Sequence, residues 1–387
     1  MRILFLTEGD AQSWDCWSGT SKSLVDQLRA AGHTVDARDV DLYGTDRVLG
    51  AALTFSPNRR RWGTRFHLGA PSFRMRSRNA ARHIAAQRGA VDVILQIGAT
   101  FEPQRRGVLP YFLYCDSNIR MAEHGAKTGY SDAVSLSPRE LERVARRELS
   151  VYQRASGIFT LSERLRRSFV DDFGLPETRV HAVHAGPNFD VTQIAHESSP
   201  PAPTSRDVST RPPTILFVGR QFHRKGGDLL IEAFRRVRER LPQAQLLIAG
   251  PPAAPEGAHA PGIRFLGDLN KNDAAGWAAL QDAYRSADVF CLPTRFEPFG
   301  IAFIEAMCFG LPCVGTAAWA VPEMVVDGET GYTIPIDDVD ALTDRLLQLL
   351  NDPWLARAMG RAGRQRVEQH FTWQRVVERM TQAMTPE

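Results

Sequence analysis

Long apolar runs and paired cysteines are both missing from this chain of 387 residues. No stretch reaches the length of about 18 uncharged apolar residues that marks a transmembrane helix, so none is predicted. The five cysteines include no Cys-x-x-Cys pair, which argues against a zinc or redox site. We expect Cys291, Cys308 and Cys313, which fall in apolar segments, to be buried thiols in a reducing cytoplasm.

Two further patterns are absent near the N-terminus. The apolar run before Glu8 is too short for a signal peptide, so we expect a first strand at residues 2–7. The loop that follows lacks the Gly-x-Gly-x-x-Gly pattern, which disfavours a nicotinamide-dependent dehydrogenase. It does contain Gly19, which opens a predicted helix. This glycine either permits the close approach of a ligand or only allows the helix to start.

The chain does contain two series of alternating strand and helix patterns, which favour doubly wound parallel sheets of the α/β class. A stretch rich in Pro and Ser separates the two series and has the composition of a linker. We predict a first domain at residues 1–186, a linker at 187–213, a second domain at 214–370 and a terminal helix at 371–387. The strands predicted in the first domain are 2–7, 34–38, 91–97, 111–115, 157–161 and 180–183.

The second series opens with a buried strand at residues 214–218, which runs into Gly219-Arg220 and then Lys225. In open α/β sheets ligands bind at the carboxyl ends of the strands, so both cations are candidates to bind a ligand. Arginine offers a planar fork to phosphate oxygens and lysine a mobile point charge, while Gly219 permits close approach. A loop arginine or lysine is more often simply solvated, so this pattern needs support from elsewhere.

That support comes from two carboxylates, Glu297 and Glu305, which follow an apolar strand at residues 289–292. Pro298 suits the first turn of a helix, so we expect Glu297 at the helix mouth and Glu305 about 12 Å along it. The free N–H groups between them would face a diphosphate, and the carboxylates would accept hydrogen bonds from the sugars on either side. Taken alone, the two acids are equally well explained as a cap and a helix-surface residue.

In this order and spacing, Arg220, Lys225, Glu297 and Glu305 resemble the donor site of the retaining nucleotide-sugar glycosyltransferases of family 4, which have the GT-B fold. The resemblance is strongest over residues 214–351. It implies two Rossmann-like domains that face a cleft, with the terminal helix crossing back to the first domain. The expected substrates are a UDP- or GDP-type sugar and an acceptor hydroxyl, on a glycan or a lipid-linked precursor.

The resemblance also assigns a role to each site residue. Arg220 and Lys225 would bind the donor diphosphate. Glu305 would hold the ribose hydroxyls, and Glu297 would contact the transferred sugar. The backbone amides of three further residues would complete the pocket, namely Gly300, Ile301 and Ala302. Retention follows from the resemblance, and the departing phosphate would take the acceptor proton, so no separate base is expected.

Two departures from the family pattern and two acidic motifs qualify this picture. The first loop has one glycine where many members have two, and the bulky Trp319 replaces glycines that precede Pro322-Glu323. The pairs Asp39/Asp41 and Asp338/Asp340 match the acidic motif of metal-dependent glycosyltransferases, but we interpret them as the end of a strand and the cap of a helix. No metal and no cofactor are therefore expected.

The first domain offers a weaker candidate for acceptor binding and a conspicuous basic segment. Asp116 ends the strand 111–115 and is expected either to contact acceptor or sugar hydroxyls or to cap local structure. From Arg59 to Arg88 the chain has nine arginines and no Asp or Glu. We predict that this segment meets an anionic membrane surface or a lipid-phosphate acceptor, where each cation gains about 1 kcal/mol. A solvated basic face is the alternative, and no nucleic-acid module accompanies it.

The prediction is therefore a retaining hexosyltransferase of the cytoplasm, located at the inner face of the membrane as a peripheral protein. Two other functions stay open. One is a GT-B-fold nucleotide-sugar epimerase, which would convert the donor without an acceptor. The other is a non-catalytic module that binds a sugar nucleotide or a membrane.

Overall fold

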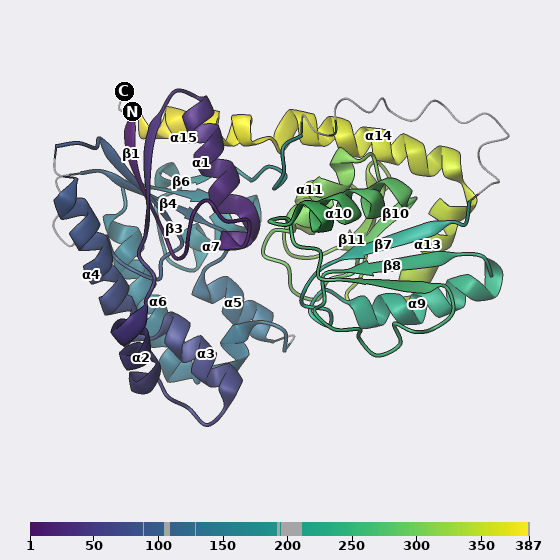
Figure 1. The fold of residues 1–387 in the computed structure, drawn as a ribbon, viewed down its shortest axis with the longest axis horizontal. Helices are drawn as coiled ribbons and strands as arrows, with labels where there is room; N and C mark the ends of the chain where they lie inside the picture. Colours follow the sequence, from purple (N-terminus) through teal and green to yellow (C-terminus); the bar gives the residue numbers. More distant parts are fainter. Residues whose placement is uncertain (88, 104–108, 128, 192–193, 195–210, 386–387) are drawn as a thin grey trace. The chain divides into compact units, whose positions relative to one another are not determined.

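The computed structural model describes the whole chain except residues 88, 104–108, 128, 192–193, 195–210 and 386–387. The chain divides into two compact units (Figure 1). Unit 1 comprises Met1–Ala185 and Trp373–Glu387, and unit 2 comprises Gly186–Thr372. Most of the predicted linker 187–213 lies outside the described residues.

Unit 1 is built on a six-stranded parallel sheet with the order β2-β1-β3-β4-β5-β6. Strands such as Tyr111–Cys115 are buried along their whole length, as expected for a parallel sheet that helices cover on both faces. All six predicted strands are confirmed, each end within two residues of its predicted position. Their bounds are β1 Arg2–Thr7, β2 Thr34–Asp39, β3 Val93–Ile97, β4 Tyr111–Cys115, β5 Gly157–Thr160 and β6 Val180–Ala182.

The terminal helix α15 belongs to unit 1, as the predicted fold requires. Its apolar face, which includes Val376, Val377 and Met380, is buried, and the helix packs against α1. His33 Nε2 lies 3.2 Å from Thr381 Oγ1 and links this helix to the turn before β2. The helices of unit 1 are η1 Cys16–Gly19, α1 Thr20–Ala30, α2 Gly44–Leu53, α3 Arg59–Leu68, α4 Ala70–Ala86, α5 Ile119–Ala126, η2 Asp132–Ser135, α6 Pro138–Arg154, α7 Glu163–Asp171, η3 Glu177–Arg179 and α15 Trp373–Met384.

Unit 2 repeats the plan with a second six-stranded parallel sheet, in the order β12-β11-β10-β7-β8-β9. Its strands are β7 Thr214–Val218, β8 Gln245–Ala249, β9 Ile263–Gly267, β10 Val289–Leu292, β11 Cys313–Thr316 and β12 Gly331–Ile334. Its helices are α9 Gly227–Arg240, α10 Ala274–Ser286, α11 Ile301–Cys308, α12 Val321–Met324, α13 Val339–Asn351 and α14 Pro353–His370. Asp338 caps α13, because its Oδ1 accepts a hydrogen bond of 2.8 Å from Ala341 N.

The three cysteines predicted to be buried, Cys291, Cys308 and Cys313, are buried free thiols in the core of unit 2. Burial raises the pKa of each of these thiols above its ordinary value. They are therefore packing residues rather than reactive groups.

Both sheets reverse their strand order next to their first strand. In unit 1 the chain goes from β1 outward to β2 and then returns to the other side of β1 at β3. In unit 2 it goes from β7 through β8 to β9 and then returns to the other side of β7 at β10. Such a reversal leaves a crevice at the carboxyl ends of the two central strands, where ligands of open α/β sheets bind. The topology therefore predicts one site in each unit.

The helix expected to begin at Pro298 begins later, so that prediction was wrong. The first residue of α11 is Ile301, and Gly300 before it has a left-handed backbone with φ of +107°. A left-handed residue does not continue an α-helix, so Glu297, Pro298 and Phe299 belong to the loop after β10. The 12 Å helical spacing between Glu297 and Glu305 therefore does not apply.

The basic segment is also less uniform than its sequence indicates. Arg76 is only 2% exposed, and its Nη2 forms ion pairs with Glu8 at 2.8 Å and Asp41 at 3.0 Å. Arg61 and Arg65 pair with Glu140 of α6. These acids lie far away in the sequence, so a count within the segment misses them. The described arginines of the segment that remain exposed are Arg59, Arg60, Arg74, Arg78 and Arg82, and Arg88 lies outside the described residues. Among all the described helices, none is long and apolar enough to cross a membrane.

Candidate functional site

The candidate donor site lies at the crevice of unit 2, where the loops after β7, β9 and β10 emerge on one edge of the sheet. Arg220 and Lys225 come from the loop after β7, and Glu297 comes from the loop after β10. These are the two strands between which the chain reverses direction. The sequence pattern and the topology therefore select the same edge.

Close packing of the backbone explains the glycines of the loop after β7. Gly226 has φ of +72°, and a Cβ there would come within 2.0 Å of Pro293 O, in the loop after β10. A Cβ on Gly219 would lie 3.1 Å from the Lys225 side chain, and one on Gly250 would lie 2.7 Å from the Gly219 backbone. Glycine thus lets the loops after β7, β8 and β10 converge without clashes.

Lys225 and Glu297 form a buried ion pair at the centre of this site. The lysine ammonium contacts Glu297 Oε2, and the exposed fractions of the two side chains are 13% and 6%. Burial lowers the pKa of Lys225 from its ordinary value, although the Glu297 carboxylate opposes that change. Arg224 adds a second cation 3.9 Å from Glu297 Oε1 and donates a hydrogen bond of 2.6 Å to Phe296 O. The sequence prediction did not include Arg224.

Arg220 lies at the same edge but is much more accessible. Its side chain is 57% exposed, and its guanidinium lies 3.1 Å from Asp268, which follows β9. Asp268 is itself 36% exposed. An exposed ion pair of this kind contributes little to stability and is readily exchanged for another anion. Arg220 therefore offers a guanidinium that is positioned but not buried.

Glu305 forms a second buried ion pair, with Lys271. The Lys271 ammonium contacts Glu305 Oε1, and the exposed fractions of the two side chains are 18% and 6%. Asn188 N donates to the same oxygen at 3.2 Å, and Tyr284 Oη donates to Oε2 at 3.3 Å. Lys271 is in the loop after β9, so this pair lies at the same edge of the sheet. Several donors thus hold the carboxylate of Glu305 in one orientation.

The start of α11 connects the two carboxylates. No side chain caps this helix end, and Gly300 is its N-cap residue. A Cβ on Gly300 would lie 3.0 Å from Phe303 and 3.2 Å from Glu297 Cγ, so the position has no room for a larger residue. The N–H groups of Ile301 and Ala302 belong to the first turn, where N–H groups have no partner within the helix. They form an anion-binding end of the kind that phosphates occupy.

Arg295 and Trp319 support the loop that carries Glu297. Arg295 is 7% exposed and donates to Asp228 from two nitrogens, at 2.7 and 3.0 Å. Trp319 Nε1 donates to Arg295 O at 2.9 Å, and its ring meets Phe296 edge-on at 4.8 Å. The bulky side chain at position 319 therefore packs under the loop after β10 and has a structural role of its own.

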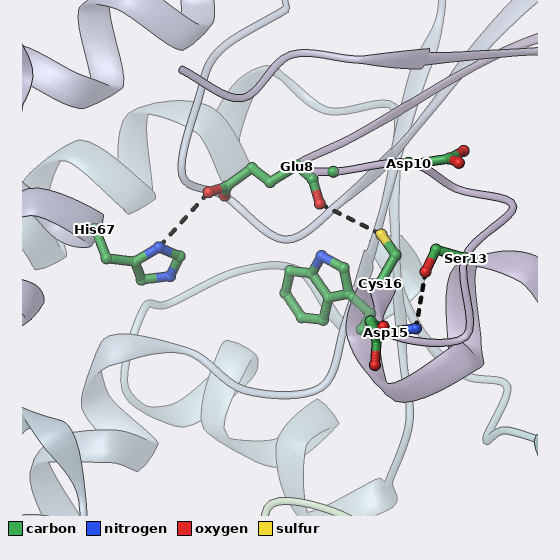
Figure 2. A pocket seen from close by; sticks show the side chains of 8 residues that line it. Glu8, Asp10, Ser13, Asp15, Cys16 and His67 are labelled. Atoms are coloured by element: carbon green, nitrogen blue, oxygen red, sulfur yellow. Dashed lines mark hydrogen bonds and ion pairs between the residues drawn. The ribbon is translucent and has the colours of Figure 1, made fainter. Parts of the chain in front are cut away.

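Unit 1 has a cavity of about 470 Å³ at its own crevice, at the carboxyl end of β1. Figure 2 shows Glu8 facing His67 of α3, with Ser13, Asp15 and Cys16 on the loop that leads to α1. His67 Nδ1 lies 3.6 Å from Glu8 Oε2. The residues that line the cavity are Glu8, Gly9, Asp10, Ser13, Asp15, Cys16, Trp17 and His67.

The two candidates predicted in unit 1 lie near this cavity but do not line it. Gly19, with φ of +90°, is the residue before α1 and follows Trp17 closely in the chain. Asp116 follows β4, on the same edge of the sheet as Glu8. The sequence prediction missed the lining residues because carboxylates, serine and tryptophan in a loop have no distinctive spacing.

Lys271 is the most informative residue that the sequence prediction missed. The chain has only four lysines among its 47 basic residues, at positions 22, 127, 225 and 271. Two of these four pair with the two glutamates of the predicted site. A charged residue in the apolar helix Ile301–Cys308 requires a cation nearby, because an unpaired buried charge is very unfavourable. The scarcity of lysine could have pointed to Lys271 as that cation.

Comparisons with known proteins agree with this geometry. A family model described as "Glycosyl transferases group 1" matches residues 202–366. One relative is the GDP-mannose-dependent monoacylated alpha-(1-6)-phosphatidylinositol monomannoside mannosyltransferase of Corynebacterium glutamicum. The two sequences are 34% identical over 188 residues, a segment that makes up 45% of this chain and 48% of that protein. This match spans about half the length of the relative. The chain is also 30% identical over 276 residues to the GDP-mannose-dependent alpha-(1-6)-phosphatidylinositol monomannoside mannosyltransferase of Mycolicibacterium smegmatis, 66% of each chain.

Solved structures resemble the fold along its whole length. Sucrose-phosphate synthase from Thermosynechococcus elongatus superimposes with a TM-score of 0.68 at 19% identity, over 99% of this chain and 98% of that one. The Anabaena protein Alr3699/HepE, in complex with UDP and glucose, gives a TM-score of 0.61 at 16% identity, over 99% of both chains. Together with the two parallel six-stranded sheets, these likenesses show that the chain has the GT-B fold, and the family model assigns residues 202–366 to the glycosyl transferases of group 1.

Proposed function

We propose that the chain transfers a hexose from a nucleoside diphosphate sugar to an acceptor hydroxyl with retention of anomeric configuration. The observation that carries this proposal is the convergence of Arg220, Lys225, Glu297 and Glu305 at the crevice of unit 2. Two cations, an uncapped helix start and two oriented carboxylates suit a diphosphate with a sugar at each end. The named relatives favour a GDP-linked sugar as the donor.

In this proposal, Arg220 and Lys225 stabilise the charge that grows on the departing diphosphate. Lys225 has three N–H donors, so it keeps its bond to Glu297 while it donates to a phosphate oxygen. Arg220 exchanges Asp268 for the phosphate, which its exposed position allows. The first-turn amides of α11 add donors of fixed orientation, and fixed donors are the most effective at stabilising a developing charge.

Glu297 and Glu305 orient the two ends of the donor. Glu305 accepts hydrogen bonds from the ribose hydroxyls, and Lys271 and Tyr284 hold it in place. Glu297 accepts from hydroxyls of the transferred sugar, and Lys225 holds it in a fixed position. Because the departing phosphate takes the acceptor proton, the reaction needs no dedicated base. Arg220, Lys225 and the start of α11 offset the diphosphate charge, so the proposal includes no metal ion. The group transferred leaves the phosphate oxygen and joins the acceptor oxygen.

The acceptor is proposed to bind in the cavity of unit 1. The loops after β1 and β3 frame the crevice of the first sheet, which is the counterpart of the donor site in unit 2. The aromatic ring of Trp17 suits the apolar face of a sugar or cyclitol, and the carboxylates of Glu8 and Asp10 suit its hydroxyl groups. Asp116, at the same edge, is proposed to contact the acceptor, whereas Gly19 is proposed to permit the close approach of the donor.

Peripheral association with an anionic membrane is also part of the proposal. The exposed arginines of α3 and α4 support it, as do relatives that are named for phosphatidylinositol mannosides. The membrane-facing set is smaller than the sequence indicates, because Arg61, Arg65 and Arg76 have acidic partners within unit 1.

A donor screen by thermal shift tests the transferase proposal. GDP-mannose, GDP, UDP-glucose and UDP are compared, and the bound donor is expected to raise the midpoint of unfolding. Product analysis with inositol-containing acceptors then reports transfer, and a donor-only reaction reports epimerisation. No stabilisation by any nucleotide sugar, or a new sugar formed without acceptor, contradicts the proposal.

A further inference from the structure

A second cavity in unit 1, of about 280 Å³, has an apolar wall and a basic rim. The apolar wall comes from three helices and the segments beside them, and it comprises Leu53, Phe55, Leu68, Leu136 and Val144. The rim includes Arg65, Arg143 and Arg147. Only one acid, Glu140, lines the cavity, and it already pairs with Arg61 and Arg65. The cavity therefore has an excess of positive charge next to apolar surface.

The mouth of the cavity lies on the most apolar exposed surface of the described chain. Nine large hydrophobic side chains among the described residues are exposed, and five of them fall between Tyr43 and Phe55. Leu49 and Leu53 have i, i+4 spacing on α2 and are 50 and 59% exposed, and Val48 beside them is 70% exposed. Phe55 is 61% exposed. A cluster of exposed apolar side chains of this kind marks a contact surface, whereas single exposed apolar residues do not.

The packing of the described part of unit 1 leaves the apolar side chains of Val48, Leu49, Leu53 and Phe55 exposed. α2 packs on α3 and α4 (Figure 1), and a Cβ on Gly50 would lie 3.1 Å from Phe66 and 3.5 Å from Ser72. Trp62 of α3 donates from Nε1 to Ala51 O at 2.9 Å, and its ring meets Phe55 edge-on at 5.5 Å. Trp62 thus lies directly behind one wall of the cavity.

The basic residues at the rim are held in fixed positions. Arg147 donates to Leu68 O, and its guanidinium lies 5.1 Å from the centre of the Phe73 ring. Burial lowers the pKa of Arg147, Glu148 raises it, and repulsion from the nearby Arg74 lowers it. An anion at the rim would relieve that repulsion. A peptide or a second protein would need acidic groups beside an apolar chain, whereas an anionic lipid supplies both in one molecule.

We propose that this cavity binds an acyl chain of an anionic bilayer lipid, with the lipid phosphate at Arg143 and Arg147 and the exposed face of α2 in the apolar layer. The inference rests on the proposed membrane association and gives it a defined site. It also changes the location of the contact, from the whole arginine segment to the corner formed by α2, α3 and α6.

Vesicle binding with brominated lipids tests the site, because bromine quenches tryptophan fluorescence at contact. Vesicles of brominated phosphatidylglycerol are expected to quench Trp62, and vesicles of brominated phosphatidylcholine are expected to quench it far less. Trp62→Phe should remove most of the quenching. Short-chain phosphatidylglycerol below its micelle concentration should bind as a monomer and protect Trp62 from quenching by the brominated vesicles. This protection distinguishes an acyl chain bound in the cavity from adsorption of the protein to a membrane surface.

Matched variants distinguish lipid binding in the cavity from general adhesion of the protein to vesicles. Phe55→Glu should weaken flotation with phosphatidylglycerol vesicles about tenfold or more, because a buried phenylalanine side chain gains about 1.5–3 kcal/mol. Ile336→Glu, which changes an exposed apolar residue of unit 2, should not weaken it. Arg143→Glu should remove the preference for phosphatidylglycerol, whereas Arg146→Glu on the same helix, 70% exposed and paired with Glu142, should keep most of it.

The outcomes distinguish two kinds of failure. No flotation with either lipid overturns both the membrane association and the cavity, and leaves the transferase proposal unaffected. Flotation that survives Phe55→Glu, with quenching that survives Trp62→Phe, overturns the cavity alone and returns the membrane contact to the exposed arginines. Circular dichroism of each variant confirms that its fold is intact.

Discussion

Lys225 donates a hydrogen bond to Glu297, although the two residues are 72 positions apart in the sequence. A cation assigned to the phosphates and a carboxylate assigned to the sugar are thus one buried pair. Removal of either partner leaves an uncompensated charge in a buried position, which is more harmful than the loss of the contact itself. Mutations at this pair therefore affect both stability and turnover, and the two effects need separate measurements.

Lys225→Ala and Arg220→Ala are each expected to lower turnover by about two orders of magnitude or more, because each removes a donor to the leaving diphosphate. Only Lys225→Ala should also lower the free energy of unfolding, since Arg220 and Asp268 form an exposed pair. Steady-state kinetics and urea unfolding measure the two effects. Near-normal turnover in both variants would refute the assignment.

A double-mutant cycle isolates the pair itself. Glu297→Gln in the Lys225→Ala background removes the orphaned charge, so the double variant should be more stable than Lys225→Ala alone. Its turnover should stay low. Recovery of turnover together with stability would show that Lys225 acts only by holding the fold.

The second pair, Lys271 and Glu305, is expected to govern affinity for the nucleotide. Lys271→Ala should weaken the binding of free nucleoside diphosphate about tenfold, because Glu305 loses the contact that orients it. Titration calorimetry with GDP and UDP measures this affinity without any acceptor. The double variant Lys271→Ala, Glu305→Gln should regain stability but not affinity. An unchanged affinity in Lys271→Ala would assign the lysine a purely structural role.

Much of the fold was predictable because its signals are local. Each parallel strand is a short apolar run bounded by loops, and β4 at Tyr111–Cys115 was predicted to the residue. Arg220, Lys225 and Glu297 were predictable as a set with Glu305 because loops at strand ends carry the first three and the helix that follows carries the fourth. The start of α11 was not, because proline and glycine both occur within three residues of it and the left-handed conformation of Gly300 depends on its neighbours.

Contacts between distant segments were beyond the sequence. The partners of Arg76 lie 68 and 35 positions earlier, at Glu8 and Asp41, so the segment appeared uniformly basic. The pair Lys271–Glu305 was missed for the same reason, because only folding brings its two residues together. The exposure of the apolar residues at α2 likewise depends on how the chain packs.

The role of Arg76 can be compared with that of an arginine on the same helix. Arg76→Met should lower the free energy of unfolding by about 3–5 kcal/mol, because Glu8 and Asp41 lose their buried cation. Arg78→Met changes an exposed side chain of α4 and should fall within about 0.5 kcal/mol of the unchanged protein. Urea unfolding of both variants measures the difference. Equal stability of the two variants would mean that Arg76 belongs to the surface arginines after all.

Glu148 of α6 is expected to make the stability of the protein depend on pH. Burial raises the pKa of its carboxyl to about 7, although Ile119 N and Tyr152 Oη donate to it at 3.0 Å each. In the unfolded chain the pKa of a glutamate is about 4.3, so the folded state holds its proton more tightly. Stability from this group is complete below pH of about 4.3 and is lost as the pH rises through about 7.

Glu148→Gln keeps a neutral group of the same shape at all pH values, so it should remove this loss. Relative to the unchanged protein, the variant should gain stability as the pH rises from about 5 to 8, by at most about 4 kcal/mol. Urea unfolding at several pH values measures this gain, and Glu142→Gln, at an exposed site on the same helix, is the control. In acid the Glu148 carboxyl is itself protonated and neutral, so the gain should be smallest there. A gain that is the same at every pH would mean that Glu148 is not the group that titrates.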